Sequence, residues 1–149
     1  MARAPFPVEV LTPEGLVFKD EVEMVSTRTE VGEIGVLANH APLLALLAPA
    51  ELRLHQGEND VKRYAQGEGY LQVHSNHALV LVEDCVEPDR IDVAEQRERL
   101  EKAQRVIDEH GGRPGADDRD EEPSARLERA YRDKRRAETF LRVAGEQGT

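Results

Sequence analysis

The chain has 149 residues, of which 34% are charged and 4% are aromatic, and its formal net charge at pH 7 is -10. This acidity excludes binding to nucleic acid or to an anionic membrane by general attraction, because both need a positive protein surface. The single cysteine, Cys85, excludes an internal disulfide and a thiolate metal cluster. The sequence has no apolar leader and no long apolar run, so we expect neither a secretory signal nor direct membrane insertion.

Residues 8–83 predict an antiparallel β-sandwich or barrel. Short apolar or alternating runs are separated by turn residues at intervals of roughly ten residues. The first hairpin is expected from residues 8–11 to 16–18, because the turn sequence TPEG at 12–15 sets proline and glycine where a tight turn needs them. Further strands are expected at 21–26, 52–55, 61–65 and 70–74, with the last two paired to each other. The sequence SNH at 75–77 predicts another turn, and ALVLV at 78–82 predicts a strand buried on both faces.

The segment 32–47, GEIGVLANHAPLLALL, is almost uncharged within a very charged chain. Gly32 and Gly35 flank Glu33 and Ile34, which predicts sharp turns on both sides and a carboxylate presented at a tip. The leucines that follow are too hydrophobic for a solvated loop. They must contact either the core of this chain or a partner.

After Pro88 the hydrophobic period changes from 2 to 3.6, which predicts a boundary between residues 1–88 and 89–149. Asp92 and Glu95 resemble a capping box for a first helix that ends at His110. Residues 111–123 are expected to be a flexible linker, and Ser124 is expected to cap a second helix that runs to about Ala144. The expected apolar stripes are Val93, Leu100, Ala103 and Ile107 in the first helix and Leu127, Tyr131, Ala137, Leu141 and Ala144 in the second. Stripes this thin predict a helical hairpin that can dock reversibly.

The second helix is basic. Residues 124–142 carry seven Lys/Arg and three Asp/Glu, a balance of +4 in an acidic chain. This pattern predicts contact with acidic groups of a partner. A solvated face balanced by the acidic residues 117–122 explains the same pattern equally well.

Several sequence blocks in the first 92 residues lie in the order and spacing of one family. They are VEVLTPEG at 8–15, VF at 17–18, GEIGVL at 32–37, NHAPLL at 39–44, LR at 52–53, GYL at 69–71, Asn76 and VL at 80–81. In these blocks the chain resembles the epsilon subunit of bacterial F-type ATP synthase. The resemblance implies a β-sandwich of about ten strands followed by an α-helical hairpin.

This likeness also implies a function without catalysis. Members of the family are rotor subunits of the central stalk, couple proton translocation through the c-ring to ATP synthesis, and lie peripherally at the cytoplasmic face of the bacterial membrane. The implied partners are the gamma subunit, the c-ring and, when the hairpin is extended to inhibit ATP hydrolysis, the catalytic beta and alpha subunits.

The resemblance assigns residues to these contacts. The c-ring contact is expected at Thr29, Glu30, Gly32 and Glu33. The gamma-subunit contact is expected at Ile34, Gly35, Val36, Leu37, His40, Ala41, Pro42 and Leu43. The inhibitory helix is expected to act through Arg126, Arg129, Arg132, Arg135 and Arg136.

Some members of the family bind ATP on the hairpin, and here that motif is incomplete. Ile91, Asp92 and Arg136 are kept, but Glu95 and Gln96 replace an Arg-Ala pair and Phe140 replaces a second arginine. A carboxylate in place of a phosphate-binding cation reverses a close Coulomb interaction, at a cost on the order of 1 to 4 kcal/mol. We therefore expect weak or absent ATP binding and no cofactor.

Two rival functions remain. The first is an enzyme or a metal site, whose candidate residues are His40, His55, His74, His77 and His110. The His74 and His77 pair falls on an expected turn with no third ligand nearby. The sequence also contains no phosphate-binding loop and no nucleophile motif. We expect no catalysis and no metal. The other rival is a free-standing interaction module whose basic second helix binds RNA or another acidic partner. The scarcity of aromatic residues and the total charge oppose nucleic acid.

Overall fold

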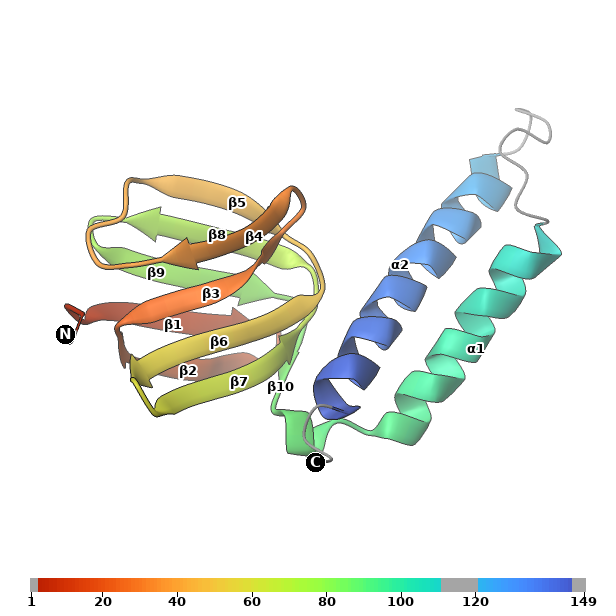
Figure 1. Cartoon of the computed structure of the whole chain (residues 1–149). Coiled ribbons are helices and arrows are strands. Elements are labelled where there is room, and N and C mark those ends of the chain that lie inside the picture. Colours follow the sequence, from red (N-terminus) through yellow and green to blue (C-terminus); the bar gives the residue numbers. More distant parts are fainter. Residues whose placement is uncertain (1–2, 111–120, 146–149) are drawn as a thin grey trace. The chain divides into compact units, whose positions relative to one another are not determined.

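The computed structural model describes residues 3–110 and 121–145 of the chain. They form two compact units, 1–90 and 91–149, each of which is considered by itself. Figure 1 shows strands in the first unit and a pair of helices in the second. Within the described residues, neither helix is both long and apolar enough to cross a membrane.

The first unit is one sheet of ten strands that folds over on itself into a sandwich (Figure 1). The strand order is β10-β7-β6-β3-β5-β8-β9-β1-β2, and β4 pairs with β3. All pairs are antiparallel except β1 with β9. The predicted β-sandwich is confirmed. The strands are β1 Phe6–Thr12, β2 Gly15–Val22, β3 Met24–Thr29, β4 Gly32–Val36, β5 Leu43–Leu47, β6 Ala50–Gly57, β7 Asp60–Gln66, β8 Gly69–His74, β9 His77–Val82 and β10 Cys85–Val86, and the 3-10 turn η1 Pro88–Arg90 follows.

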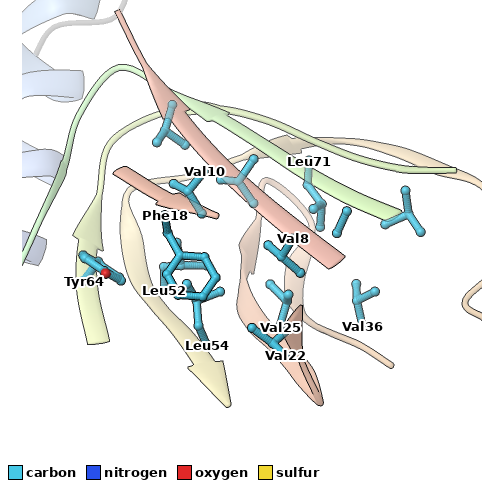
Figure 2. Packing of buried hydrophobic residues seen from close by; sticks show 14 of the residues in the cluster. Val8, Val10, Phe18, Val22, Val25, Val36, Leu52, Leu54, Tyr64 and Leu71 are labelled. Atoms are coloured by element: carbon cyan, nitrogen blue, oxygen red, sulfur yellow. The ribbon is translucent and has the colours of Figure 1, made fainter. Parts of the chain in front are cut away.

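Alternate residues of the strands fill the space between the layers. Val8 and Val10 of β1, Leu52 and Leu54 of β6, and Leu71 of β8 are fully buried (Figure 2). The period of two in these strands places every second side chain inside. The whole core consists of Phe6, Val8, Val10, Phe18, Val22, Val25, Val36, Leu47, Leu52, Leu54, Tyr64, Leu71, Val73, Ala78, Val80 and Val82.

The predicted turns at 12–15 and 75–77 are confirmed. The first joins β1 to β2, where Val10 lies opposite Phe18 and Gly15 has a φ of 131°. The second is a tight turn in which His74 lies opposite His77, while Ser75 and Asn76 adopt φ values of 49° and 59°. Backbone of this kind favours glycine and asparagine over β-branched residues.

One prediction about the extent of a strand and one about strand pairing are wrong. The expected strand at 21–26 is interrupted at Glu23, so that β2 and β3 are separate strands. The expected strands 61–65 and 70–74 lie within β7 and β8, but they do not pair with each other because β6, β3 and β5 stand between them. The short connection after β7 is held by the bond from Gly67 N–H to the carbonyl of Asp84, which carries the chain away from β7. Instead, β7 pairs with its neighbour β6 and with the distant β10, and β8 pairs with its neighbour β9 and with the distant β5.

The strand at 78–82 is not buried on both faces as predicted. In β9, Ala78, Val80 and Val82 are buried, whereas Leu79 is half-buried and Leu81 is 41% exposed. One face of β9 meets the core, and the other is partly exposed. The strand thus contributes leucines to an outer surface.

The second unit consists of α1 Val93–Glu109 and α2 Glu121–Gly145. Asp92 caps α1 as predicted, since its side chain accepts a bond from the Glu95 N–H at 3.1 Å, but the Glu95 carboxylate pairs with Arg99 and does not complete a capping box. The prediction for the start of α2 is wrong, because the helix begins three residues before Ser124 and includes residues 121–123 of the expected linker. Pro123 is tolerated there, since the first turn needs no N–H from it. The rest of that linker, 111–120, lies outside the described residues.

The buried stripes differ from those predicted. In α1, Ala103 and Ile107 are buried as expected, but Gln96 is buried as well. In α2, Tyr131 is 44% exposed, contrary to the prediction, whereas Ala137 is buried. The other buried residues of α2 are Ala130, Thr139, Phe140 and Val143. The helix is rotated relative to the expected stripe, and Phe140 becomes its largest buried side chain.

Candidate interaction surface

The turn between β3 and β4 is a pre-formed tip. The Thr29 hydroxyl donates to the carbonyl of Gly32 at 2.9 Å and accepts from the N–H of Val31 at 3.2 Å. Gly32 has a φ of 145°, a conformation that L side chains rarely adopt. These bonds hold Glu30 and Val31 outward, and Val31 is 98% exposed. Thr29 itself is buried.

Glu33 does not lie at a tip, contrary to the prediction. It lies within β4, exposed, with Arg28 of β3 as its cross-strand partner. The second predicted turn, at Gly35, is also wrong because Gly35 is part of the same strand and has no positive φ. The carboxylate at the tip is that of Glu30, and Glu33 stands beside it on the strand.

The segment expected to contact a gamma subunit divides between core and surface. Val36 is fully buried, and Ile34 and Leu43 pack partly against the core. Gly35 and Leu37 are exposed, as are Ala41 and Pro42, whereas His40 is half-buried.

The loop after β4 is fastened rather than loose. The Asn39 N–H donates to Asn76 Oδ1 at 2.7 Å, which ties the loop to the turn between β8 and β9. The His40 N–H donates to the carbonyl of Leu37 at 3.2 Å. A partner therefore meets a loop that is already ordered.

The leucine run of β5 serves both the core and the surface. Leu43 and Leu47 point inward, whereas Leu44 is 71% exposed and Leu46 is 54% exposed. Strand periodicity forces this division, because successive side chains point to opposite faces.

Leu46 belongs to a row of apolar side chains that crosses four strands. The register places Leu46 opposite Tyr70, Tyr70 opposite Leu81, and Leu81 opposite Leu11. Tyr70 is 50% exposed and Leu11 is half-buried. We call Leu11, Leu46, Tyr70 and Leu81 the apolar row. Sequence reasoning assigned the leucines of 43–47 to the core or a partner, but it missed that the row continues through Tyr70, Leu81 and Leu11. Alternation within ALVLV would have indicated that Leu79 and Leu81 share a face opposite to the core.

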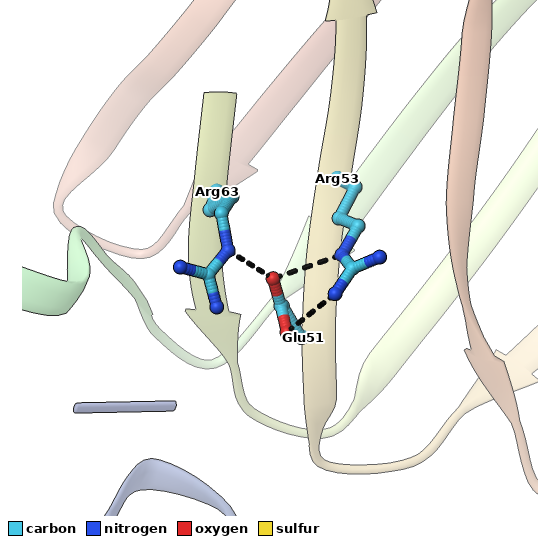
Figure 3. A network of polar contacts seen from close by, with 3 residues as sticks. All are labelled: Glu51, Arg53 and Arg63. Atoms are coloured by element: carbon cyan, nitrogen blue, oxygen red, sulfur yellow. Dashed lines mark hydrogen bonds and ion pairs between the residues drawn. The ribbon is translucent and has the colours of Figure 1, made fainter. Parts of the chain in front are cut away.

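Glu51 forms a polar cluster with two arginines between β6 and β7 of the sandwich (Figure 3). Its carboxylate accepts from Arg53 Nε at 2.9 Å and also from Arg63 Nε. Burial raises the pKa of Glu51, but the hydrogen bonds and charges of Arg63 and Arg53 outweigh it and hold this pKa below its ordinary value. The cluster joins two strands through their side chains.

In the second unit, the residues kept from the nucleotide motif already have partners. Asp92 caps α1, and Arg136 donates from Nη1 to Gln96 Oε1 at 3.1 Å. The Arg136 guanidinium also lies 4.2 Å from the centroid of the Phe140 ring, a stacking contact. Ile91 is half-buried. Of the residues that depart from the motif, Gln96 thus links α1 to α2 and Phe140 stacks on Arg136, whereas Glu95 pairs with Arg99 within α1.

The basic residues of α2 are largely on the surface. Arg126, Arg129, Arg132 and Arg135 are exposed, and Arg136 is half-buried. Arg126 and Arg129 line a cleft of about 310 Å³ between the helices. Arg99 and Lys102 of α1 line the same cleft, which makes it markedly positive.

Residues 5–88 match the family model described as ATP synthase, Delta/Epsilon chain, beta-sandwich domain. Over 94% of its length, the chain is also 38% identical to the ATP synthase epsilon chain of Persephonella marina, of which the match spans 96%. The chain belongs to the ATP synthase epsilon chain family. The resemblance inferred from the sequence blocks is confirmed, and the epsilon chain family is one of accessory subunits rather than of enzymes that act alone.

Other epsilon chains are similar over nearly the whole chain. The ATP synthase epsilon chain of Bacillus pumilus is 33% identical over 93% of this chain and 95% of its own length. That of Rubrobacter xylanophilus is 32% identical over 93% of this chain and 91% of its own length.

Solved structures share the fold. A chain in the cryo-EM structure of the Euglena gracilis mitochondrial ATP synthase, OSCP/F1/c-ring in rotational state 1, matches with a TM-score of 0.70 at 21% identity, over 95% of this chain and 84% of that one. A chain of the Tetrahymena thermophila mitochondrial ATP synthase central stalk and c-ring matches with a TM-score of 0.60 at 14% identity, over 97% and 99% of the two chains. At these identities the likeness concerns the fold.

The histidines considered for a metal site are dispersed. Among residues 3–110 and 121–145, no three His, Cys, Asp or Glu side chains are grouped so that they could hold a metal ion. His74 and His77 are cross-strand neighbours, and His77 Nε2 lies 3.5 Å from Glu9 Oε2.

Proposed function

We propose that this member of the epsilon chain family is a rotor subunit in the central stalk of an F-type ATP synthase. In this proposal its sandwich binds the gamma subunit and the c-ring and helps to couple proton translocation to ATP synthesis, while its helices inhibit ATP hydrolysis. The subunit lies peripherally at the cytoplasmic face of the bacterial membrane. The observation that carries the proposal is the exposed apolar surface of β5, β8 and β9 on a sandwich whose own core is complete.

The gamma subunit is the partner we assign to this surface. A joint that transmits torque needs a packed contact of the obligate type, and such contacts are rich in apolar and aromatic side chains. Leu44 and the apolar row provide them. Of the residues expected from the sequence, Leu37, Ala41 and Pro42 are exposed and suited to direct contact, whereas Val36 supports them from the core.

The c-ring is the partner we assign to the tip between β3 and β4. Glu30 and Glu33 offer carboxylates that can accept charge-assisted hydrogen bonds, and Val31 adds an exposed apolar side chain between them. Thr29 and Gly32 act by shaping the turn, because their groups are used within it.

The helices are the regulatory element in this proposal. When extended, α2 presents Arg126, Arg129, Arg132 and Arg135 to acidic groups of the catalytic alpha and beta subunits. ATP does not serve as the signal, since Arg136 is engaged with Gln96 and Phe140. Isothermal titration of the full chain with ATP tests this point, and a submillimolar affinity would contradict it.

The decisive experiment separates the two assigned surfaces. Leu46→Asp combined with Leu81→Asp is expected to abolish co-purification with the gamma subunit, because two charges enter an apolar contact. Val31→Asp is the matched control. It places one charge at the tip, should leave gamma binding intact, and should reduce proton pumping by the reconstituted enzyme.

Normal gamma binding by the double variant would remove the apolar surface from the proposal. If the wild-type chain fails to bind the gamma subunit but binds an acidic protein through α2, the chain is instead a free-standing interaction module.

A further inference from the structure

The cleft between α1 and α2 carries cations on both of its walls. Arg99 and Lys102 belong to α1, whereas Arg126 and Arg129 belong to α2. Asp133 is the one carboxylate among the described residues that line the cleft. Four cations therefore face a single acid, and their positive potential favours an anion that lies between the helices.

Small side chains leave the space in this cleft. Ala103 of α1 and Ala130 of α2 line it and are 5% and 4% exposed, so they form its floor. A water molecule has a share of about 30 Å³ in the liquid, whereas the cleft measures about 310 Å³. A phosphate-sized ion and several waters thus fit between the walls.

The arginines of α2 are open to a ligand. Both are exposed, and in the described part of the chain no hydrogen bond or ion pair engages either Arg126 or Arg129. A guanidinium offers several N–H donors in one plane, and this arrangement matches the oxygens of a phosphate group. The α2 wall therefore presents donors of the kind that binds phosphate.

The cations of α1 have partners that they can exchange. Arg99 Nη2 lies 2.8 Å from Glu95 Oε1, and Lys102 Nζ lies 3.0 Å from Glu98 Oε1. All four side chains are at least half exposed, and the two glutamates do not line the cleft. Exposed ion pairs of this kind contribute little to stability, so both cations can turn to an anion in the cleft without a large loss.

This cleft differs from the place of the nucleotide motif. Ile91, Asp92 and Arg136, the residues kept from that motif, do not line it. The described lining also has no aromatic side chain on which a base could stack. Its chemistry therefore suits a phosphate group alone rather than a whole nucleotide.

We propose that this cleft binds a phosphate-sized oxyanion, which accepts charge-assisted hydrogen bonds from α1 and α2 at once and so holds the two helices together. A tetrahedral oxyanion fits better than a carboxylate, because its oxygens can face both walls. An ion that binds the paired helices but not the separated ones stabilises their pairing by mass action.

The bound ion also opposes inhibition of ATP hydrolysis. It occupies Arg126 and Arg129, two of the arginines that the proposed function presents to the catalytic subunits. This consequence rests on the proposed function, whereas the binding itself rests on the cleft alone.

The first test is a titration of the isotopically labelled full chain with inorganic phosphate, in chloride buffer at constant ionic strength. Amide signals of residues 103 and 130 should shift and saturate. Arg126→Gln combined with Arg129→Gln should weaken binding by about tenfold or more, because the α2 wall loses its charge-assisted bonds. Arg99→Gln combined with Lys102→Gln should also weaken it. Unchanged binding by this second variant would confine the ion to α2 and overturn the proposed bridge.

Arg105→Gln combined with Arg142→Gln is the matched control. It removes the same charge from the chain, and both arginines are exposed residues of the two helices that do not line the cleft. Its affinity for phosphate should stay within about twofold of the wild type. Equal weakening by the control and by the Arg126 and Arg129 variant would show general charge attraction instead of a site.

Adenosine monophosphate, titrated in parallel, separates free phosphate from the same group on a nucleoside. With no aromatic side chain in the described lining, the base should add little, and the two affinities should agree within about threefold. Binding of the nucleotide that is tenfold tighter or more would assign the cleft to nucleotides and overturn the proposal.

The second test measures hydrogen exchange of the full chain. Phosphate at about ten times its Kd should slow exchange in α1 and α2 about tenfold relative to chloride of equal ionic strength, and should leave β6 and β8 unchanged. The Arg126 and Arg129 variant should not respond. Saturating phosphate that leaves exchange in both helices unchanged would overturn the claim that the ion holds them together.

The outcomes separate the cleft from the proposed function. If phosphate does not bind while the chain still binds the gamma subunit, the cleft proposal is overturned and the proposed function stands. If the chain does not bind the gamma subunit but phosphate binds and slows exchange in the helices, the cleft stands and the proposed function falls.

Discussion

The two units of this chain are held together in different ways. In the sandwich, sixteen buried apolar side chains from most of the strands form one core, and Glu51 with its two arginines adds a polar link between β6 and β7. In the described part of the helical unit, the large buried apolar side chains are Ile107, Phe140 and Val143. At roughly 1.5 to 3 kcal/mol for each, before the cost of ordering, the helices are held by a few kcal/mol.

This difference suits the roles that the proposed function gives to the two units. A surface that transmits force must keep its shape, and the sandwich places the apolar row on strands that a large core fixes. A regulatory element must change state under a modest bias, and a population shift between two states needs only a few kcal/mol. In the proposed function, the sandwich would therefore serve as a rigid platform and the helices as the element that is released.

The largest effect is expected at Gly69, where the sandwich tolerates no side chain. A Cβ at this position would collide with the carbonyl oxygen of Leu81 and lie 2.7 Å from Cα of Val82, both of which are backbone atoms of the paired strand. Gly69→Ala should destabilise the first unit by about 3 kcal/mol or more, because β8 and β9 must separate to make room. Denaturant unfolding of the full chain measures the loss.

Gly57→Ala is the control for that substitution. Its nearest contact would be Asp60 Cβ at 3.8 Å, an ordinary van der Waals distance. We expect the free energy of unfolding to change by less than about 1 kcal/mol. Equal losses at the two glycines would show that the close approach of β8 to β9 is not rigid.

Gly69 also illustrates what the sequence could and could not predict. The strands were predictable wherever alternation is regular, as in 52–55, and so was the turn at 75–77, whose residues tolerate positive φ. A distant partner was not, because β7 pairs on its other side with β10, which follows β8 and β9 in the chain. Likewise, the collision at Gly69 arises from Leu81, which no local pattern relates to it.

The candidate site was predictable to a similar degree. The segment 32–47, singled out from the sequence, contains the outward leucines and adjoins the tip. Sequence reasoning placed Glu33 rather than Glu30 at the tip, because the position of the turn depends on which residues of β3 and β4 lie opposite each other. Gln96 was missed because its partner, Arg136, lies forty residues later. Burial of a polar side chain becomes favourable only when such a distant partner is present.

A comparable effect, confined to the helices, is expected from Phe140→Ala. Phe140 is 1% exposed and stacks against Arg136, so its loss removes apolar burial and a ring contact together. We expect the free energy that stabilises the helical unit to fall by about 3 to 5 kcal/mol, with no change in the sandwich. This is enough to release helices that are held by only a few kcal/mol. Hydrogen exchange should show faster exchange in α1 and α2 and unchanged protection in β6 and β8.

Leu52→Ala is the matched change in the sandwich. Leu52 is fully buried, and its truncation should cost about 2 to 5 kcal/mol. Because the sandwich has a large core, the unit should stay folded and lose protection uniformly. If Phe140→Ala lowers protection in the strands as strongly as in the helices, the two units unfold as one cooperative body. The two units would then not differ in how firmly they are held together.

The smallest effect concerns Glu51, whose arginine partners lower its pKa. A carboxyl group with a lower pKa in the folded state stabilises that state at pH values above its unfolded pKa, and this contribution disappears as the pH falls through the folded pKa. Glu51→Gln should therefore destabilise the sandwich by under about 1 kcal/mol near neutral pH, given the partial exposure of both arginines. Below the ordinary glutamate range the difference between wild type and variant should vanish. Unfolding by urea at a series of pH values measures the free energy of unfolding of both proteins. Subtracting the value of the variant from that of the wild type removes the contribution of the other carboxylates, which both proteins share. A difference that stays constant down to acidic pH would mean that Glu51 stabilises the two strands through packing alone.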